Sequence, residues 1–264
     1  MFYQPGTTDH GLPHDPFKVW PPTPSLPSVY NPTCTEATFK IQACVVPRPI
    51  GWISTKSPNG ISNLAPYSQF TNLTFDPPYV VFSANQTVDG TRKDTVKNIE
   101  ATGHFVWNLA TYPLREAVNI TAEQVPYGVD EFERAKLTKE SATLIDVDMV
   151  KESPVKFECV YHSTMRLPGN PPMGTVDVVV GRVIGVHVDE GVIDERGRIN
   201  VAKTQPIARL GYYEYAVVKE TFEMVIPGAN SKAVLYGLEG SAKSNRERFE
   251  SGMGEKSERN ISSL

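Results

Sequence analysis

Runs of residues with the two-residue alternation of β-strands dominate the middle of the chain. The longest run, residues 175–188, contains Gly181 and Gly185, which we expect to mark bulges or sharp bends of the kind that barrels require. Further strands are expected at residues 38–46, 50–55, 79–84, 104–110 and 155–165. The pattern therefore predicts a mainly β protein.

The stretch ISNLAPYSQF, residues 61–70, alternates like a strand but carries polar residues and a proline in its interior. Asn59-Gly60, just before it, is a strong signal for a two-residue hairpin turn. Pro66 lacks an N–H group, so we expect it to break the ladder and free nearby backbone groups for another partner. The stretch either presents these groups to a ligand or is an irregular edge strand.

Two segments have the pattern of helices. The first spans residues 94–102, with Asp94 as the N-cap and Gly103 as the left-handed stop. The second begins at Pro113, a favoured first-turn position, and continues through LREAVNITAEQ. Many strands with a few inserted helices predict a closed antiparallel barrel, and a two-layer sandwich is the alternative.

The two ends of the chain differ from its middle in composition. Residues 1–35 contain eight prolines and little periodicity, which predicts an extended arm. Residues 229–264 are polar toward their end and evenly charged, which predicts a disordered extension. A single folded domain is expected between them, over residues 36–228.

Charge and cysteine content narrow the range of partners and compartments. The net charge of the 264 residues is −4, so no global field favours nucleic acid or an anionic membrane. No apolar run approaches the roughly 18 residues that span a bilayer, and the first residues lack the pattern of a secretory signal. The sparse, odd set of Cys34, Cys44 and Cys159 is typical of a reducing compartment. We expect a cytoplasmic protein.

Several common catalytic motifs are missing from the sequence. It contains no dinucleotide fingerprint after a strand, no nucleoside-triphosphate loop and no nucleophile elbow. The five histidines show no paired metal-ligand spacing. We therefore expect neither a metal site nor a catalytic side chain.

The segment TRKDT, residues 91–95, directly precedes the first expected helix. A helix N-terminus offers unpaired N–H groups and a partial positive charge, so it attracts anions. Arg92 could fork onto a phosphate, Lys93 would add a point charge and Thr95 a hydroxyl donor. The alternative is a solvated turn of mixed charge.

Three motifs in order resemble those of the flavin reductase-like family. They are PRPIGWISTKSPNGISNLAPYSQFTNLTFDPPYVVFS, TRKDTVKNIEATGHFVWNLA and RVIGVHVDEGVIDERGRI followed by PIARLGYYEY. The resemblance covers residues 38–218 and leaves the arm and the extension outside it. It implies a split β-barrel that binds FMN and a homodimer with the flavin near the subunit interface.

The resemblance also implies the residues that would hold FMN. Contacts to the ring are expected from Ser54, Thr55, Asn63, Leu64, Ala65 and Ser68. The phosphate is expected at Arg92, Lys93 and Thr95, and the ribityl chain or phosphate at Ser83 and Asn85. Tyr212 and Tyr213 either approach the flavin, from the same or the partner subunit, or pack within the barrel.

An NAD(P)H-dependent flavin reductase is the function that this resemblance implies. NAD(P)H would give a hydride to the flavin, and the electrons would pass to a partner monooxygenase, iron or another acceptor. The alternatives are an FMN-binding electron carrier without its own NAD(P)H turnover and a split-barrel oxidase of the pyridoxamine-phosphate type. The LAPYS and KDT stretches favour the reductase over the oxidase.

Overall fold

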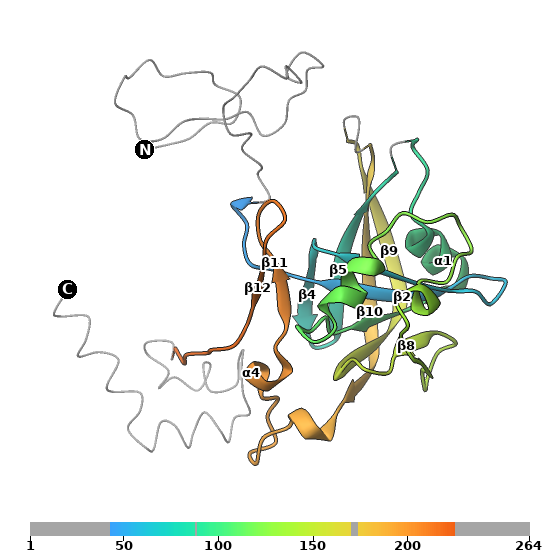
Figure 1. Ribbon diagram of the computed structural model, residues 1–264. Helices are drawn as coiled ribbons and strands as arrows, with labels where there is room; N and C mark the ends of the chain where they lie inside the picture. The colour runs from blue at the N-terminus through green and yellow to red at the C-terminus, as the bar shows by residue number, and fades with distance from the viewer. Residues whose placement is uncertain (1–42, 88, 170–173, 225–264) are drawn as a thin grey trace, which may run out of the picture. The chain divides into compact units, whose positions relative to one another are not determined.

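The computed structural model describes residues 43–87, 89–169 and 174–224 (Figure 1). The expected arm, the expected extension and Cys34 lie outside the described residues. The chain divides into two compact units, Met1–Lys219 and Glu220–Leu264, and all the elements below belong to the first.

Seven strands form one antiparallel sheet in the order β3-β2-β6-β9-β10-β5-β4. Two small sheets, β1-β11-β12 and β7-β8, accompany it. The seven strands are β2 (Gly51–Lys56), β3 (Ser62–Tyr67), β4 (Phe70–Phe75), β5 (Pro78–Asn85), β6 (His104–Asn108), β9 (Val155–Leu167) and β10 (Val176–Val188). The others are β1 (Arg48–Pro49), β7 (Lys139–Ser141), β8 (Asp148–Val150), β11 (Ile207–Arg209) and β12 (Tyr215–Val217).

The large sheet curls into a barrel because its two edges are consecutive in the chain. β3 and β4 lie at opposite ends of the strand order, yet only Ser68 and Gln69 separate them. Two residues span at most about 7 Å, so the two edges must approach each other. Phe70, at the start of β4, stacks on Trp107 of β6 with ring centroids 5.4 Å apart. No ladder between β3 and β4 is found among the described residues. We call the junction of these two edges the seam.

The barrel confirms the expected fold class. It encloses an apolar cluster that includes Ile53, Phe82 and Phe105 and packs against helix α1 (Asp94–Thr102). The register of β10 against β9 shifts at Val180/Gly181 and again at Val183/Gly185, so both predicted glycine bulges are confirmed. A Cβ at position 181 would lie 2.2 Å from the Phe105 ring, which shows why glycine suits that bulge.

Pro66 does not break its strand, which corrects the expectation drawn from the sequence. β3 pairs with β2 at every position from Ser62 to Tyr67. The N–H of Leu64 points away from β2 and donates to Glu131 Oε2 at 3.0 Å. Pro66 lies two residues further on, so its missing N–H also faces the free edge and no ladder bond is lost.

The helices are close to the predicted ones, but their starts differ. α1 (Asp94–Thr102) has the expected bounds and ends at Gly103 with φ 78°. Its N-cap is Lys93 rather than Asp94, because Asp94 already has helical geometry in the first turn. α2 (Arg115–Ile120) begins two residues after Pro113. The short α3 (Glu131–Arg134), α4 (Val201–Thr204) and the 3₁₀ helix Glu190–Val192 were not predicted.

Two segments near the start of the described chain, an expected strand and a hairpin loop, also differ from expectation. Residues 43–46 form no strand, so this part of the expected run 38–46 is wrong. The β2–β3 hairpin is confirmed, but Ser57 N–H donates to Ile61 O at 2.8 Å, which closes a three-residue loop. Gly60 supplies the left-handed conformation in that loop, with φ 82°.

Candidate functional site

Lys93 stands at the N-terminus of α1 and forms no ion pair with any described residue. Its side chain is half-buried and makes no capping bond, and within the described residues no carboxylate lies within ion-pair distance. The neighbouring Asp94 instead pairs with Lys97, 3.3 Å away. Burial lowers the pKa of the Lys93 ammonium, and the charge of Asp94 opposes this shift. A cation at the positive end of a helix favours an anionic ligand.

Thr95 ties the start of α1 to β3. Asn63 Nδ2 donates to Thr95 Oγ1 at 3.0 Å, and both residues are buried. Burial raises the pKa of the Tyr67 phenol, which also hydrogen-bonds to Thr95. One face of β3 carries Asn63, Ala65 and Tyr67, because every second residue of a strand points to the same side. The fold thus unites two predicted site residues, Asn63 and Thr95, from segments 32 residues apart.

Arg92 has its guanidinium committed to carboxylates. Its Nε lies 3.2 Å from Asp177 Oδ2, and its Nη2 lies 2.8 Å from Glu100 Oε1. Arg166 pairs with the same two carboxylates, and Asp177 is almost fully buried. The guanidinium that we expect to fork onto a phosphate thus contacts two carboxylates within the protein, and its phosphate contact stays a prediction. Through these two contacts Arg92 fixes the TRKDT segment to β10 and α1.

Ser54 and Thr55 point to opposite faces of β2, because the side chains of adjacent strand residues alternate between faces. Both are fully buried. Ser54 Oγ accepts from Asn108 at 3.2 Å, and Thr55 Oγ1 accepts from Asn98 at 3.1 Å. Both hydroxyls therefore serve internal bonds between secondary-structure elements.

Three further predicted contacts are Leu64, Ser83 and Asn85. Leu64 is fully buried in the apolar cluster with Phe132, and its N–H donates a hydrogen bond to Glu131. Ser83 and Asn85 are half-buried and alternate with the buried core residues of β5, so they lie on its outer face.

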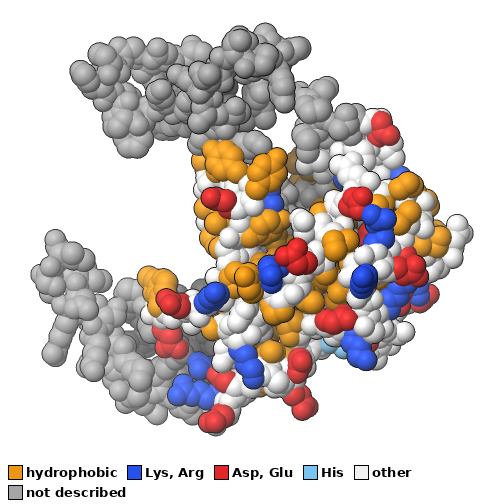
Figure 2. All heavy atoms as spheres, viewed as in Figure 1, with side chains coloured by type: hydrophobic (Ala, Val, Ile, Leu, Met, Phe, Trp, Pro, Cys, Tyr) orange, Lys and Arg blue, Asp and Glu red, His pale blue; other side chains and the backbone are white. Residues whose placement is uncertain are grey.

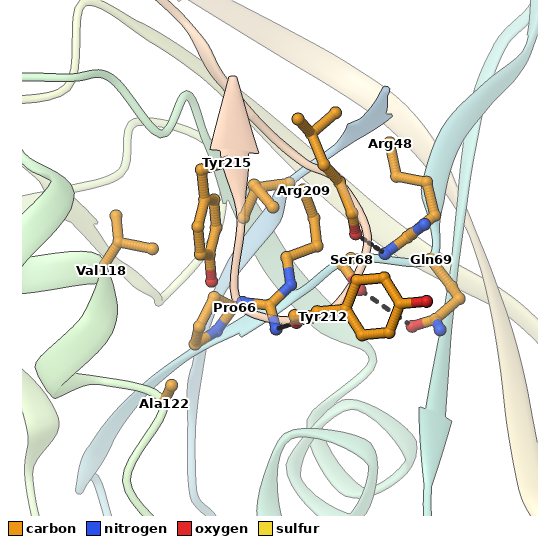
Figure 3. Close-up of a pocket in the computed structure, with 11 residues that line it drawn as sticks. Arg48, Pro66, Ser68, Gln69, Val118, Ala122, Arg209, Tyr212 and Tyr215 are labelled. Atoms are coloured by element: carbon orange, nitrogen blue, oxygen red, sulfur yellow. Dashed lines mark hydrogen bonds between the residues drawn. The ribbon is translucent and has the colours of Figure 1, made fainter. Parts of the chain in front are cut away.

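A pocket of about 300 Å³ opens at the seam, and we call it the seam pocket. It brings two predicted residues, Ser68 and Tyr212, together with residues that sequence reasoning missed (Figure 3). Tyr213 is 90% exposed and does not line it. The lining is Arg48, Ile50, Pro66, Ser68, Gln69, Val118, Ala122, Arg209, Leu210, Tyr212 and Tyr215. A signal for the missed arginines was available, because Arg48 and Arg209 lie within the apolar stretches PRPI and IARL.

Glu131 is a buried acid that the sequence did not single out. It is 6% exposed, and within the described residues it has no cationic partner at ion-pair distance. Burial raises the pKa of its carboxyl group, and the N–H of Leu64 opposes the shift. Glu131 therefore holds the free edge of β3 at an electrostatic cost.

Two further observations concern the charge of the surface and the length of the helices. On the face shown in Figure 2, acidic and basic side chains are interspersed, in keeping with the small net charge. None of the helices in the described part of the chain has the length and apolarity needed to cross a bilayer.

Comparison with known proteins places the site in context. A sequence profile described as the flavin reductase like domain matches residues 43–218. An uncharacterized protein of Aquifex aeolicus is 39% identical over 188 residues, which cover 70% of this chain and 93% of that one.

Two solved structures are also similar. Nitrilotriacetate monooxygenase component B from Bacillus cereus is 34% identical, with a TM-score of 0.65 over 69% of this chain and 90% of that chain. The 2-nitrobenzoate 2-nitroreductase of Pseudomonas fluorescens is 27% identical, with a TM-score of 0.63 over 73% and 91% of the two chains.

The buried acid predicts a pH-dependent gain in stability for Glu131→Gln. In the folded protein the pKa of Glu131 is raised, so ionisation at neutral pH disfavours folding. Glutamine keeps an oxygen for the N–H of Leu64 without the charge. We expect a higher melting temperature for the variant at pH 7. The difference should vanish as the pH falls below the ordinary glutamate pKa of about 4.3.

Thermal unfolding followed by circular dichroism across pH 4 to 8 measures this effect. Glu133→Gln is the control, because Glu133 is exposed on the same helix, and it should change little. A lower melting temperature for Glu131→Gln at pH 7 would contradict the assignment of Glu131 as an uncompensated charge.

Proposed function

Because this chain belongs to the flavin reductase-like family, we propose that it binds FMN and catalyses NAD(P)H-dependent flavin reduction. The observation that carries the proposal is Lys93, which forms no ion pair with any described residue, at the start of α1 beside the buried Thr95–Asn63 pair. When bound, FMN supplies the redox chemistry by accepting a hydride from NAD(P)H and passing electrons to an acceptor.

The phosphate of FMN fits the N-terminus of α1. Lys93 offers a cation there. The N–H groups of Val96 and Lys97 donate to the carbonyl of Lys93, at 3.0 and 3.1 Å. The N–H groups of Asp94 and Thr95 precede them in the first turn, where a helix provides no acceptor of its own. These two donors and the ammonium would receive the phosphate oxygens, while Arg92 holds the segment in place.

The ring of FMN would then extend along β3. Asn63 and Ala65 lie on the face of β3 that meets α1, and Ser68 follows at the seam. Ser54, Thr55 and Leu64 are part of the supporting structure in this arrangement. The proposed FMN contacts are Asn63, Ala65, Ser68, Lys93 and Thr95.

The names of the similar proteins suggest two kinds of acceptor. Component B of a monooxygenase implies a partner monooxygenase that consumes electrons from the flavin. A nitroreductase implies a small molecule that is reduced directly. We propose the partner monooxygenase as the acceptor for this chain, and the cytoplasm as its compartment, since the described Cys44 and Cys159 are both free thiols.

We further propose that the protein is a homodimer. The outer face of β5, β9 and β10 presents apolar residues toward solvent, among them Val81, Val178 and Val180, which are half-buried, and Met165, which is 56% exposed. Val178 pairs with both Met165 and Ser83, so these residues form one patch. A second subunit on this patch would bring Ser83 and Asn85 to the interface, near a shared flavin.

The phosphate assignment predicts that Lys93→Ala weakens FMN binding by about ten- to a hundred-fold. This range corresponds to the 1.5–3 kcal/mol typical of a charge-assisted hydrogen bond. Affinity for riboflavin, which lacks the phosphate, should stay the same. Titration by flavin fluorescence measures both constants, and an unchanged FMN affinity would remove Lys93 from the site.

Lys93→Arg is the matched variant for this measurement. Because burial lowers the pKa of Lys93, wild-type affinity for FMN should fall as the pH rises through that lowered pKa. Arginine stays protonated over the same range, so the variant should keep its affinity. An identical pH profile for both proteins would show that Lys93 does not titrate against the phosphate.

The proposed interface predicts that Met165→Asp weakens the dimer. A charge at the centre of an apolar contact is costly to bury, so the variant should shift toward the monomer at micromolar concentration. Ile199→Asp, at an exposed apolar residue outside the patch, is the control. Light scattering decides, and a wild-type protein that is monomeric would overturn the interface.

A further inference from the structure

The seam pocket carries positive charge from two arginines. Arg48 donates to the carbonyls of Val45 and Leu210, at 2.7 and 2.8 Å. Arg209 donates to the carbonyl of Tyr212, and within the described residues no carboxylate lies within ion-pair distance of it. Burial lowers the pKa of Arg48, and the nearby charge of Arg209 lowers it further. Both guanidinium groups nonetheless stay charged at neutral pH. Because no carboxylate of the described residues pairs with Arg209, its charge makes the pocket favour an anion.

Aromatic and apolar surfaces flank these charges. The guanidinium carbon of Arg209 lies 4.6 Å from the centroid of the Tyr215 ring, and Tyr212 lies on its other side (Figure 3). Tyr212 has a left-handed backbone, with φ 55°, and Arg209 holds its carbonyl. Ile50, Val118 and Leu210 supply the apolar part of the lining. A ligand that combined an anionic head with a flat apolar body would satisfy both kinds of surface.

The size of the pocket limits the ligand further. A volume of about 300 Å³ is at the small end of the range for ligand sites. It suits a molecule of one or two rings rather than a dinucleotide. None of the residues proposed to hold the FMN phosphate lines the pocket.

We propose that the seam pocket is a binding site for a small aromatic carboxylate. Arg209, with Arg48 beside it, would receive the carboxylate through its planar fork. The ring would pack against Tyr215 and the apolar wall. Gln69 adds polar groups for substituents on the ring, and Ser68, which we also propose as an FMN contact, lies where the pocket would border the flavin.

Calorimetric titration of the full chain with benzoate tests this site, with and without FMN. Benzamide has the same shape without the charge, and inorganic phosphate has the charge without the ring. We expect benzoate to bind at least ten-fold more tightly than either one, and to bind equally with FMN present. Equal affinity for benzamide or phosphate would overturn the proposal. So would competition between benzoate and FMN, which would identify the pocket as part of the flavin site.

Two variants locate the binding without relying on one residue. Arg209→Met should weaken benzoate binding at least ten-fold while FMN affinity stays unchanged. Because Arg209 also supports the β11–β12 turn, Ala122→Trp is the second variant, since Ala122 is an exposed residue of the lining. It should block benzoate by filling the pocket. Gln124→Trp, exposed and outside the lining, is its control, and unchanged benzoate binding in Ala122→Trp would place the ligand elsewhere.

Discussion

The two-residue connection between β3 and β4 is the constraint on which the rest of the structure depends. Ser68 and Gln69 join strands at opposite edges of a seven-stranded sheet, so the sheet must curl until those edges meet. Gly51 of β2 permits this closure, because a Cβ there would lie 2.8 Å from the ring of Phe70. The same closure leaves β3 with a free edge, and it leaves a pocket where the edges meet. The proposed flavin contacts and the proposed carboxylate site both follow from that geometry.

The distribution of charge around the barrel separates supporting residues from residues that could bind a ligand. Arg92 and Arg166 share Glu100 and Asp177, so their charges are compensated within the protein. Hydrogen bonding to Arg92 lowers the pKa of Glu100 accordingly. Lys93 and Arg209 have no such carboxylate within the described residues. Lys93 lies at the start of α1, whereas Arg209 lies in the seam pocket. This separation supports the proposal of two different anionic ligands.

Local sequence patterns predicted the elements whose causes are local. Alternation located the long strands, Gly181 and Gly185 located the bulges, and Gly103 located the end of α1. The resemblance to a family located the barrel, and the Asn63–Thr95 contact agrees with the two motifs that it links. Local patterns could not predict hydrogen-bond partners that are distant in the chain. Asp177 lies 85 residues from Arg92, and Asn98 lies 43 residues from Thr55. Those partners form hydrogen bonds within the protein to side chains that we predicted as ligand contacts. The free edge of β3, which accommodates Pro66, likewise depends on the order of the strands in the sheet.

The central claim is that this barrel holds FMN and reduces it with a nicotinamide coenzyme. The most direct measurement is the visible absorbance of the FMN-loaded full chain, freed of unbound FMN, on anaerobic mixing with NADH and separately with NADPH. We predict that at least one coenzyme removes the absorbance of the oxidised flavin. Bound FMN that stays oxidised with both coenzymes would contradict the claim and would identify the protein as an electron carrier reduced by another donor.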